Sequence, residues 1–296
     1  MKKKKINKKR VLILFLIIAI VIVSIIKLNK KSSKNEDTEI DEQTPTTEQV
    51  SNDNTTNENQ TEKDENLVLE QKLQTGKKLS EDGLPVLMYH FFYDKSKDSG
   101  KDGNWIEISN FEEQMKYLAE NDFYFPTWEQ VENYIDGKQE LPEKSVVITV
   151  DDGDPSFFEL AVPIIQKYKI PTTSFVITYW YGNRANDKQD YVSYQSHSYD
   201  MHKAGSNGKG VMLSWDYDKI KDDILLSRDV LGGANIFCYP FGQYNDLDIK
   251  VLKENGYRLA FTTKGGRVKK GSSKYELPRV RISGNTGMTE FKKKVE

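Results

Sequence analysis

SVVITVDDG, residues 145–153, joins a run of β-branched residues to two adjacent aspartates and a glycine. Val, Ile and Thr favour the extended conformation, and an apolar run without polar alternation is typical of a strand buried on both faces. Strands of this kind occur in parallel sheets that helices cover. The stretch therefore predicts a central strand of such a sheet, with both carboxylates at the end of that strand.

Similar runs recur along the chain and alternate with helical patterns. We expect about seven strands, over residues 84–90, 145–150, 171–178, 191–196, 235–240, 259–263 and 277–282. The alternation of strand and helix predicts an α/β fold with a parallel sheet. An open doubly wound sheet and a closed or incomplete barrel both fit. In either fold, reactive groups are expected at the carboxyl ends of the strands.

Polar residues that can carry chemistry do follow the expected strands. Asp151 and Asp152 end the strand quoted above, and His197 and His202 follow the strand 191–196. Two imidazoles and one carboxylate form a three-ligand set for a divalent metal, with open positions for water and substrate. Taken separately, the aspartates fit an ordinary turn and the histidines fit unrelated surface positions. Their combination favours a metal site with a second carboxylate beside it.

These segments resemble a known family. The resemblance is to the first three motifs of the carbohydrate-esterase polysaccharide deacetylase family, or NodB-homology domain, and rests on TVDDG (149–153), SHSYDMH (196–202) and YPFG (239–242). LPVLMYH (84–90) and LPRVRI (277–282) resemble the branch that includes the poly-N-acetylglucosamine deacetylases. The resemblance covers residues 84–296, which we expect to form the catalytic domain.

The resemblance implies a fold, a reaction and a set of roles. The fold is a distorted (β/α) barrel, and the reaction removes N-acetyl groups from N-acetylglucosamine residues of an extracellular polysaccharide and releases acetate. Asp151 corresponds to the catalytic base, and Asp152, His197 and His202 correspond to the ligands of a divalent metal. Zinc is the first expectation, with cobalt or nickel as alternatives. The backbone N–H of Phe241 corresponds to a donor of the oxyanion hole.

The sequence departs from the family pattern in two places. Many relatives have an arginine that orients the base at the position of Cys238, so we expect Arg279 or Arg281 to take that role. Many relatives also have a late histidine that protonates the leaving amine, and this chain has no histidine after His202. His90, at the end of the first strand, is then either a proton donor or a structural residue of the barrel rim.

Aromatic residues flank the motifs, and sugar rings stack on such side chains. We expect Trp180 and Tyr181, in a polar loop that contains glycine, to contact substrate. Tyr239 and Pro240 of the third motif are further candidates.

The N-terminus differs in composition from the rest of the chain. Residues 1–10 are basic and predict a cytoplasmic tip, and the apolar residues 11–27 predict a transmembrane anchor with its lysine-rich end inside the cell. A cleaved signal peptide has the same order, but no small-x-small cleavage site follows. The polar residues 28–80 predict a flexible linker. We therefore expect a single-pass protein of the cell membrane with an extracellular catalytic domain.

Composition and charge limit the other classes of function. The net charge is -2 and the N-terminal basic cluster is far from the motifs, so nucleic-acid binding is not expected. A non-catalytic wall-binding protein with a decayed site is the main alternative, and a non-haem iron oxygenase also fits two histidines and a carboxylate. Poly-N-acetylglucosamine and peptidoglycan remain alternative polymers. We expect a monomer that acts on its polysaccharide from a membrane anchor.

Overall fold

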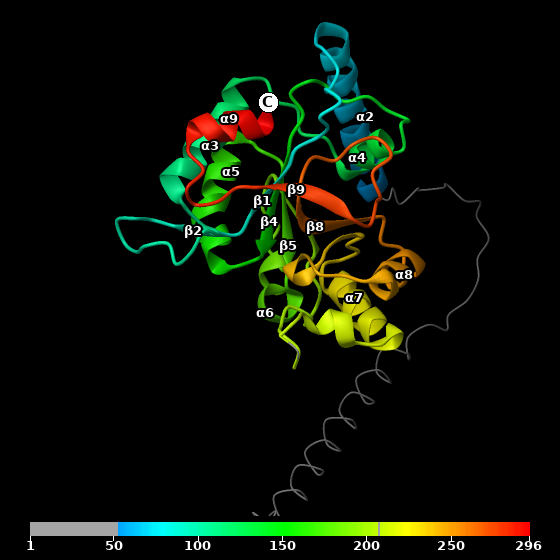
Figure 1. Cartoon of the computed structure of the whole chain (residues 1–296). Coiled ribbons are helices and arrows are strands. Elements are labelled where there is room, and N and C mark those ends of the chain that lie inside the picture. The colour runs from blue at the N-terminus through cyan, green and yellow to red at the C-terminus, as the bar shows by residue number, and fades with distance from the viewer. Residues whose placement is uncertain (1–52, 207) are drawn as a thin grey trace, which may run out of the picture. The chain divides into compact units, whose positions relative to one another are not determined.

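The computed structural model of the protein describes residues 53–206 and 208–296. Within these residues, parallel strands close into a barrel in the order β1-β4-β5-β6-β7-β8-β9 (Figure 1). The barrel strands are β1 (Val86–Tyr89), β4 (Val147–Asp152), β5 (Thr172–Val176), β6 (Val192–Ser196), β7 (Ile236–Cys238), β8 (Leu259–Gly265) and β9 (Leu277–Arg281). The predicted α/β fold with parallel strands is confirmed, and β1 pairs with both β4 and β9, so the barrel is the correct alternative.

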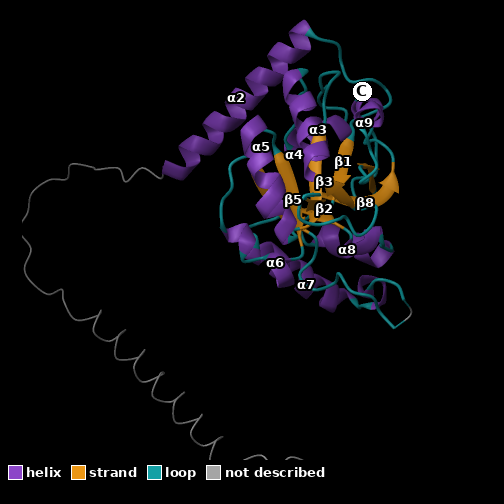
Figure 2. Cartoon of the chain, turned by 90° about the vertical axis from the view of Figure 1, so that its left-hand side faces the viewer, coloured by secondary structure: helices purple, strands orange, loops and turns teal. Residues whose placement is uncertain are grey.

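Helices surround the barrel, as Figure 2 shows. They are α2 (Asp53–Thr75), α3 (Ile108–Glu120), α4 (Trp128–Ile135), α5 (Val162–Tyr168), α6 (Thr178–Tyr181), α7 (Tyr217–Val230), α8 (Asp246–Glu254) and α9 (Met288–Val295). Beside the barrel lies a two-stranded parallel sheet of β2 (Phe91–Tyr93) and β3 (Trp105–Glu107). Short helical turns fill some connections: η1 (Phe157–Ala161), η2 (Arg184–Asn186), η3 (Val211–Ser214) and η4 (Pro240–Gly242).

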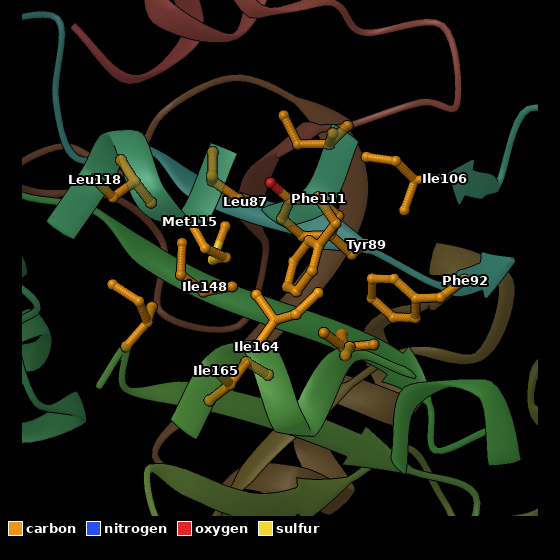
Figure 3. Close-up of a cluster of buried hydrophobic side chains, with 14 of the residues drawn as sticks. Leu87, Tyr89, Phe92, Ile106, Phe111, Met115, Leu118, Ile148, Ile164 and Ile165 are labelled. Carbon is orange, nitrogen blue, oxygen red and sulfur yellow. The ribbon is translucent and has the colours of Figure 1, made fainter. Parts of the chain in front are cut away.

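The side chains of β4 alternate between the two faces of the barrel wall. Ile148 and Val150 point outward into a cluster with α3 and α5, where Ile164 and Ile165 of α5 pack against the strands (Figure 3). Val147 belongs instead to the apolar cluster of the barrel interior. Because the period is two residues, Asp151 also faces inward at the mouth of the barrel, and Asp152 ends the strand beside it with a φ of 73°.

The interior is apolar at the end where the strands begin. The inward-facing Val86 and Leu277 pack there with Val131 of α4. A capping box starts α4, because Thr127 accepts from the backbone N–H of Gln130 while the Gln130 side chain accepts from the backbone N–H of Thr127. This apolar floor leaves the opposite end, where the strands finish, for polar groups.

The structure corrects the prediction of a flexible linker over residues 28–80. Residues 53–75 form the helix α2, whose Leu69 and Leu73 pack on the apolar cluster at the floor of the barrel. Lys72 of the same helix donates to the carbonyl of Asp122 at 2.6 Å. The two leucines are four residues apart and share one helix face, which supplies the buried apolar surface that the polar composition concealed.

The basic tip, the predicted anchor over residues 11–27 and the first part of the predicted linker lie outside the described residues. Within residues 53–206 and 208–296, none of the helices has the length and apolar character needed to span a bilayer.

Candidate active site

A pocket of about 420 Å³ opens where the barrel strands end. Its lining comes from several strand ends and loops: Met88, His90, Phe91, Asn104, Asp151, Asp152, His197, His202, Tyr239, Phe241, Gly242, Thr263 and Arg281. All three histidines of the chain line it. A cavity of about 440 Å³ lies near the start of β4 and β5, but its lining contains no histidine or cysteine, and Glu65 is its one acidic residue. The chemistry therefore concentrates at the carboxyl end of the strands.

Asp152, His197 and His202 converge on one point of this pocket. The Oδ1 atom of Asp152 lies 3.4 Å from Nε2 of His197 and 3.6 Å from Nε2 of His202. The three potential ligand atoms, one from each residue, all lie within 4.8 Å of one another. The Oδ1 atom is buried and has no hydrogen-bond partner. A buried, unpartnered carboxylate oxygen facing two imidazoles is a donor set that fits a divalent cation.

The protonation states of His202 and Asp152 also suit a cation. Burial lowers the pKa of His202 to about 4, so its imidazole is neutral and keeps a free lone pair at neutral pH. Burial opposes ionisation of Asp152, but the neighbouring histidines outweigh it and lower the pKa of that carboxyl. The Nδ1 atom of His197 lies 2.7 Å from the carbonyl oxygen of Cys238. A carbonyl accepts only, so Nδ1 carries a proton and Nε2 faces Asp152. Burial opposes a charge on His197, but its neighbours, Asp152 among them, raise its pKa well above the usual value, so a cation would bind at Nε2 in place of a proton.

The loop that carries both histidines is fixed by hydrogen bonds. The backbone N–H of His197 donates to the carbonyl of Val176 at 3.0 Å. Asp223 of α7 accepts from the backbone N–H groups of Tyr199 and Asp200, at 2.7 and 2.8 Å. One buried carboxylate therefore holds the turn between the two metal-facing imidazoles.

Asp223 is expected to make the stability of the fold pH-dependent. Burial raises the pKa of Asp223 from 3.8 to about 6, although the two N–H donors lower it. A carboxyl with a raised pKa in the folded state contributes stability that is present at low pH and lost as the pH rises through about 6. From pH 4.5 to 7.5 this loss amounts to about 2 kcal/mol in the free energy of unfolding.

Urea unfolding of the metal-free wild type and Asp223→Asn at both pH values isolates this contribution. The wild type should lose stability relative to the variant at the higher pH, because all other titrating groups are shared. An equal difference between the two proteins at both pH values would show that Asp223 titrates as an ordinary carboxyl.

Asp151 and Arg279 form an ion pair inside the barrel mouth. The Nη1 and Nη2 atoms of Arg279 donate to the two oxygens of Asp151, each at 2.7 Å. The guanidinium is 0% exposed, and its Nε donates to the carbonyl of Thr262 at 3.0 Å. Burial would raise the pKa of Asp151, but the charge and hydrogen bonds of Arg279 hold it well below its usual value.

The geometry separates the two arginines proposed from the sequence. Arg279 of β9 reaches Asp151, whereas Arg281 contacts Asn104 at the pocket rim. The Sγ atom of Cys238 lies 3.1 Å from Nη2 of Arg279 and 3.6 Å from Oδ2 of Asp151. A short side chain at Cys238 of β7 leaves space that the long side chain of Arg279 fills from β9.

His90 lies at the pocket wall beside the ion pair. Its Nε2 atom is 3.7 Å from Oδ2 of Asp151. Burial lowers the pKa of His90, although the charge of Asp151 opposes the shift, so the imidazole is neutral at neutral pH. The ring is within reach of a group bound in the pocket.

The third motif forms a strained turn over the pocket. Phe241 has a φ of 59° and the following Gly242 has a φ of 69°, both in the left-handed region. A Cβ atom at Gly242 would lie 2.1 Å from Oγ1 of Thr263, so only glycine fits at this position. The turn places the Phe241 ring 4.2 Å from the ring of His202, with 43% of the residue exposed.

Comparison with known proteins agrees with this geometry. A family model described as polysaccharide deacetylase matches residues 138–260, which include β4, the histidine loop and the third motif. Over these residues the chain is similar to the polysaccharide deacetylase family. The resemblance found in the sequence is thereby confirmed.

Two curated relatives and two solved structures illustrate the similarity. The poly-beta-1,6-N-acetyl-D-glucosamine N-deacetylase of Staphylococcus aureus strain MRSA252 is 29% identical over 212 residues, which are 65% of this chain and 72% of that protein. The protein of the same name from Staphylococcus epidermidis is 28% identical over 63% of this chain and 71% of its own. IcaB from Ammonifex degensii is 27% identical with a TM-score of 0.61, covering 70% of this chain and 95% of that structure. The Streptococcus pyogenes deacetylase PplD shares the fold, with a TM-score of 0.63 at 22% identity. The match covers 75% of this chain and 99% of that structure.

The residues predicted to contact the polysaccharide lie in different settings. Trp180 is exposed and its ring lies 6.3 Å from that of His202, at the pocket edge. Tyr181 is half-buried and is not among the residues that line the pocket. The two belong to the short helix α6 rather than to the predicted loop. The Tyr239 side chain is buried and donates to the carbonyl of Tyr275, and Pro240 is buried outside the lining. Both side chains support the turn, and Tyr239 also lines the pocket.

Several pocket residues were missed by the sequence analysis. Asn104, Phe91 and Thr263 line the pocket but lie outside the family motifs. Phe91 stacks on Trp105 with ring centroids 5.0 Å apart. Its position directly after His90 is the sequence signal that could have marked it as a pocket residue. Asn104 lies in a polar loop between β2 and β3, and the composition of that loop gave no sign of a site residue.

Proposed function

We propose that this chain is a metal-dependent hydrolase that removes N-acetyl groups from N-acetylglucosamine residues of a polysaccharide and releases acetate. The observation that carries the proposal is the arrangement of two carboxylates in one pocket. Asp152 faces His197 and His202, while the adjacent Asp151 faces Arg279. The match of residues 138–260 to the polysaccharide deacetylase family model supports the same reaction.

Asp152, His197 and His202 would hold the divalent cation. Two imidazole nitrogens and one carboxylate oxygen suit zinc first, with cobalt or nickel as further candidates, and leave positions for water and substrate. When bound, such a cation polarises the acetamide carbonyl and acidifies water. The Cys238 carbonyl would hold the His197 ring in the tautomer that ligation needs, at 2.7 Å from Nδ1.

Asp151 is proposed as the general base that takes a proton from the attacking water. Arg279 holds both oxygens of this carboxylate and keeps it ionised at any pH near neutrality. The same interaction makes Asp151 a weaker base, because basicity falls with pKa. Arg279 acts through Asp151 and is therefore a positioning residue.

Two further groups are proposed to complete the reaction. The backbone N–H of Phe241 would stabilise the developing oxyanion, and one such donor is typically worth about 3 kcal/mol of barrier. The left-handed turn at Phe241 and Gly242 fixes the direction of that N–H. His90 would give a proton to the leaving amine, and since it is neutral at the start, Asp151 at 3.7 Å can supply that proton.

The proposed substrate is a polymer of N-acetylglucosamine, with poly-β-1,6-N-acetylglucosamine as the first candidate. The names of the staphylococcal relatives point to that polymer. The exposed rings of Trp180 and Phe241 both lie near the ring of His202 and offer apolar faces on which sugar rings can stack. Peptidoglycan serves as the comparison polymer.

A membrane-anchored location, with residues 11–27 in the bilayer and a monomeric catalytic domain outside the cell, is part of the proposal. The support is the basic-then-apolar order of the N-terminus. Protease added to intact cells should digest the domain. Protection of the domain until the cells are lysed would contradict this orientation.

Acetate release tests the function directly. The full-length protein loaded with zinc should release acetate from β-1,6-linked N-acetylglucosamine oligomers, and the products should lose mass by whole acetyl groups. Peptidoglycan fragments treated in parallel show which polymer is preferred. If neither substrate releases acetate while the oligomers still bind, the chain is a non-catalytic binding protein and the proposal is wrong.

A further inference from the structure

Arg281 occupies a second layer of the barrel mouth. Residues two apart on a strand face the same side and are separated by about 7 Å along it. Arg279 points into the barrel and pairs with Asp151, so Arg281, at the end of the same strand, lies one layer nearer the opening. It lines the pocket and pairs in register with Met88 of β1.

The charge of Arg281 is not neutralised by a carboxylate. Within the described residues, no ion pair involves Arg281, and its Nη2 donates to the neutral side chain of Asn104. The loop that carries Asn104 is tied to the chain after β9, because the N–H of Gly284 donates to the carbonyl of Gly103 at 3.1 Å. The guanidinium is therefore exposed, charged and held at the rim.

The carboxylates that line the pocket face other groups and do not neutralise the charge of Arg281 at the rim. Asp151 is matched by Arg279 inside the barrel, and Asp152 is directed at the two histidines. Among the described residues that line the pocket, Arg281 is the one arginine or lysine. A sugar bound next to the reacting sugar would meet its guanidinium.

We infer that Arg281 determines specificity by repelling the ammonium group of a glucosamine unit beside the reacting sugar. The inference rests on the proposed function. An N-acetylated neighbour is neutral and can accept a hydrogen bond from the guanidinium through its carbonyl oxygen, whereas a deacetylated neighbour carries a like charge. The enzyme would therefore prefer units whose neighbour on the Arg281 side is acetylated, and it would leave spaced free amines in the product.

A competition experiment tests this discrimination. Two β-1,6-linked tetramers, one fully acetylated and one with a glucosamine next to an acetylated unit, compete for the zinc-loaded full-length protein at about pH 6.5, where an amine of this type is charged. Mass spectrometry gives the ratio of their kcat/KM values. Arg281→Gln should lower the preference for the acetylated tetramer by roughly threefold to tenfold, as expected for like charges several ångströms apart in a partly aqueous site.

Three controls separate charge from structure. Arg281→Lys keeps the charge and should retain the preference within about twofold, while salt at about 1 M, where the Debye length is ~3 Å, should reduce it in the wild type. Arg267→Gln, which lies near the start of the barrel strands, should change nothing. An unchanged ratio in Arg281→Gln, or a loss as complete in Arg281→Lys, overturns the inference while the acetate release of the wild type still supports the proposed function. No acetate from any oligomer would refute both.

Discussion

Asp151→Asn is expected to lower kcat for acetate release by roughly a thousandfold, in the middle of the range for loss of a general base. The amide has nearly the shape of the carboxylate but cannot take a proton from water. The KM should change little, because Asp151 lies beside Arg279 at the barrel mouth and not on the aromatic rim. Steady-state kinetics on N-acetylglucosamine oligomers measure both values.

The same variant should also be less stable. Asparagine leaves the fully buried guanidinium of Arg279 without a counter-charge, and breaking a buried pair on one side costs about 3–5 kcal/mol. Asp151→Asn combined with Arg279→Met removes both charges and should recover much of the free energy of unfolding without recovering activity. A double variant that regains activity would show that Asp151 is not the base.

Removal of the metal is expected to abolish acetate release, and added zinc should restore it. Binding to the folded state alone stabilises the fold by about 2.7 kcal/mol at a zinc concentration of 100 times Kd. The unfolding temperature of the stripped protein should therefore rise with zinc. His202→Ala should lose both the activity and the thermal response, because it removes one of three ligand atoms.

Two carboxylate variants test whether the metal binds at Asp152. Asp152→Asn should remove the zinc response, and it should also cost the stripped protein stability, because the neighbouring histidines favour the ionised carboxylate. Asp200→Asn is the matched control, because Asp200 lies in the histidine loop but pairs with Lys203. A full zinc response in Asp152→Asn would place the metal elsewhere.

The strand pattern and the ligand set could be predicted because they are local signals. Continuous β-branched runs specify buried strands, and parallel strands carry whatever follows them to the same edge. That rule alone brought Asp152, His197 and His202 to one site from two stretches of sequence.

The choice between Arg279 and Arg281 could not be made from the sequence. Both are arginines on one strand, and only the register of β9 against β1 decides which layer meets Asp151. The helix α2 was missed for a different reason. Its average composition is polar, and only Leu69 and Leu73 among its described side chains pack on the barrel floor. The burial of single side chains is set by tertiary packing, which composition does not record.

Because Arg279 lies on the last barrel strand, the active site is complete only when the end of the domain has been synthesised. Asp151 and its partner are separated by 128 residues, and the partner lies on the last strand. A growing chain therefore exposes an unpaired aspartate until β9 docks between β8 and β1. A product truncated before β9 would carry all three metal-facing residues and still lack an oriented base, so catalytic competence would appear only after β9 has been made and has closed the barrel.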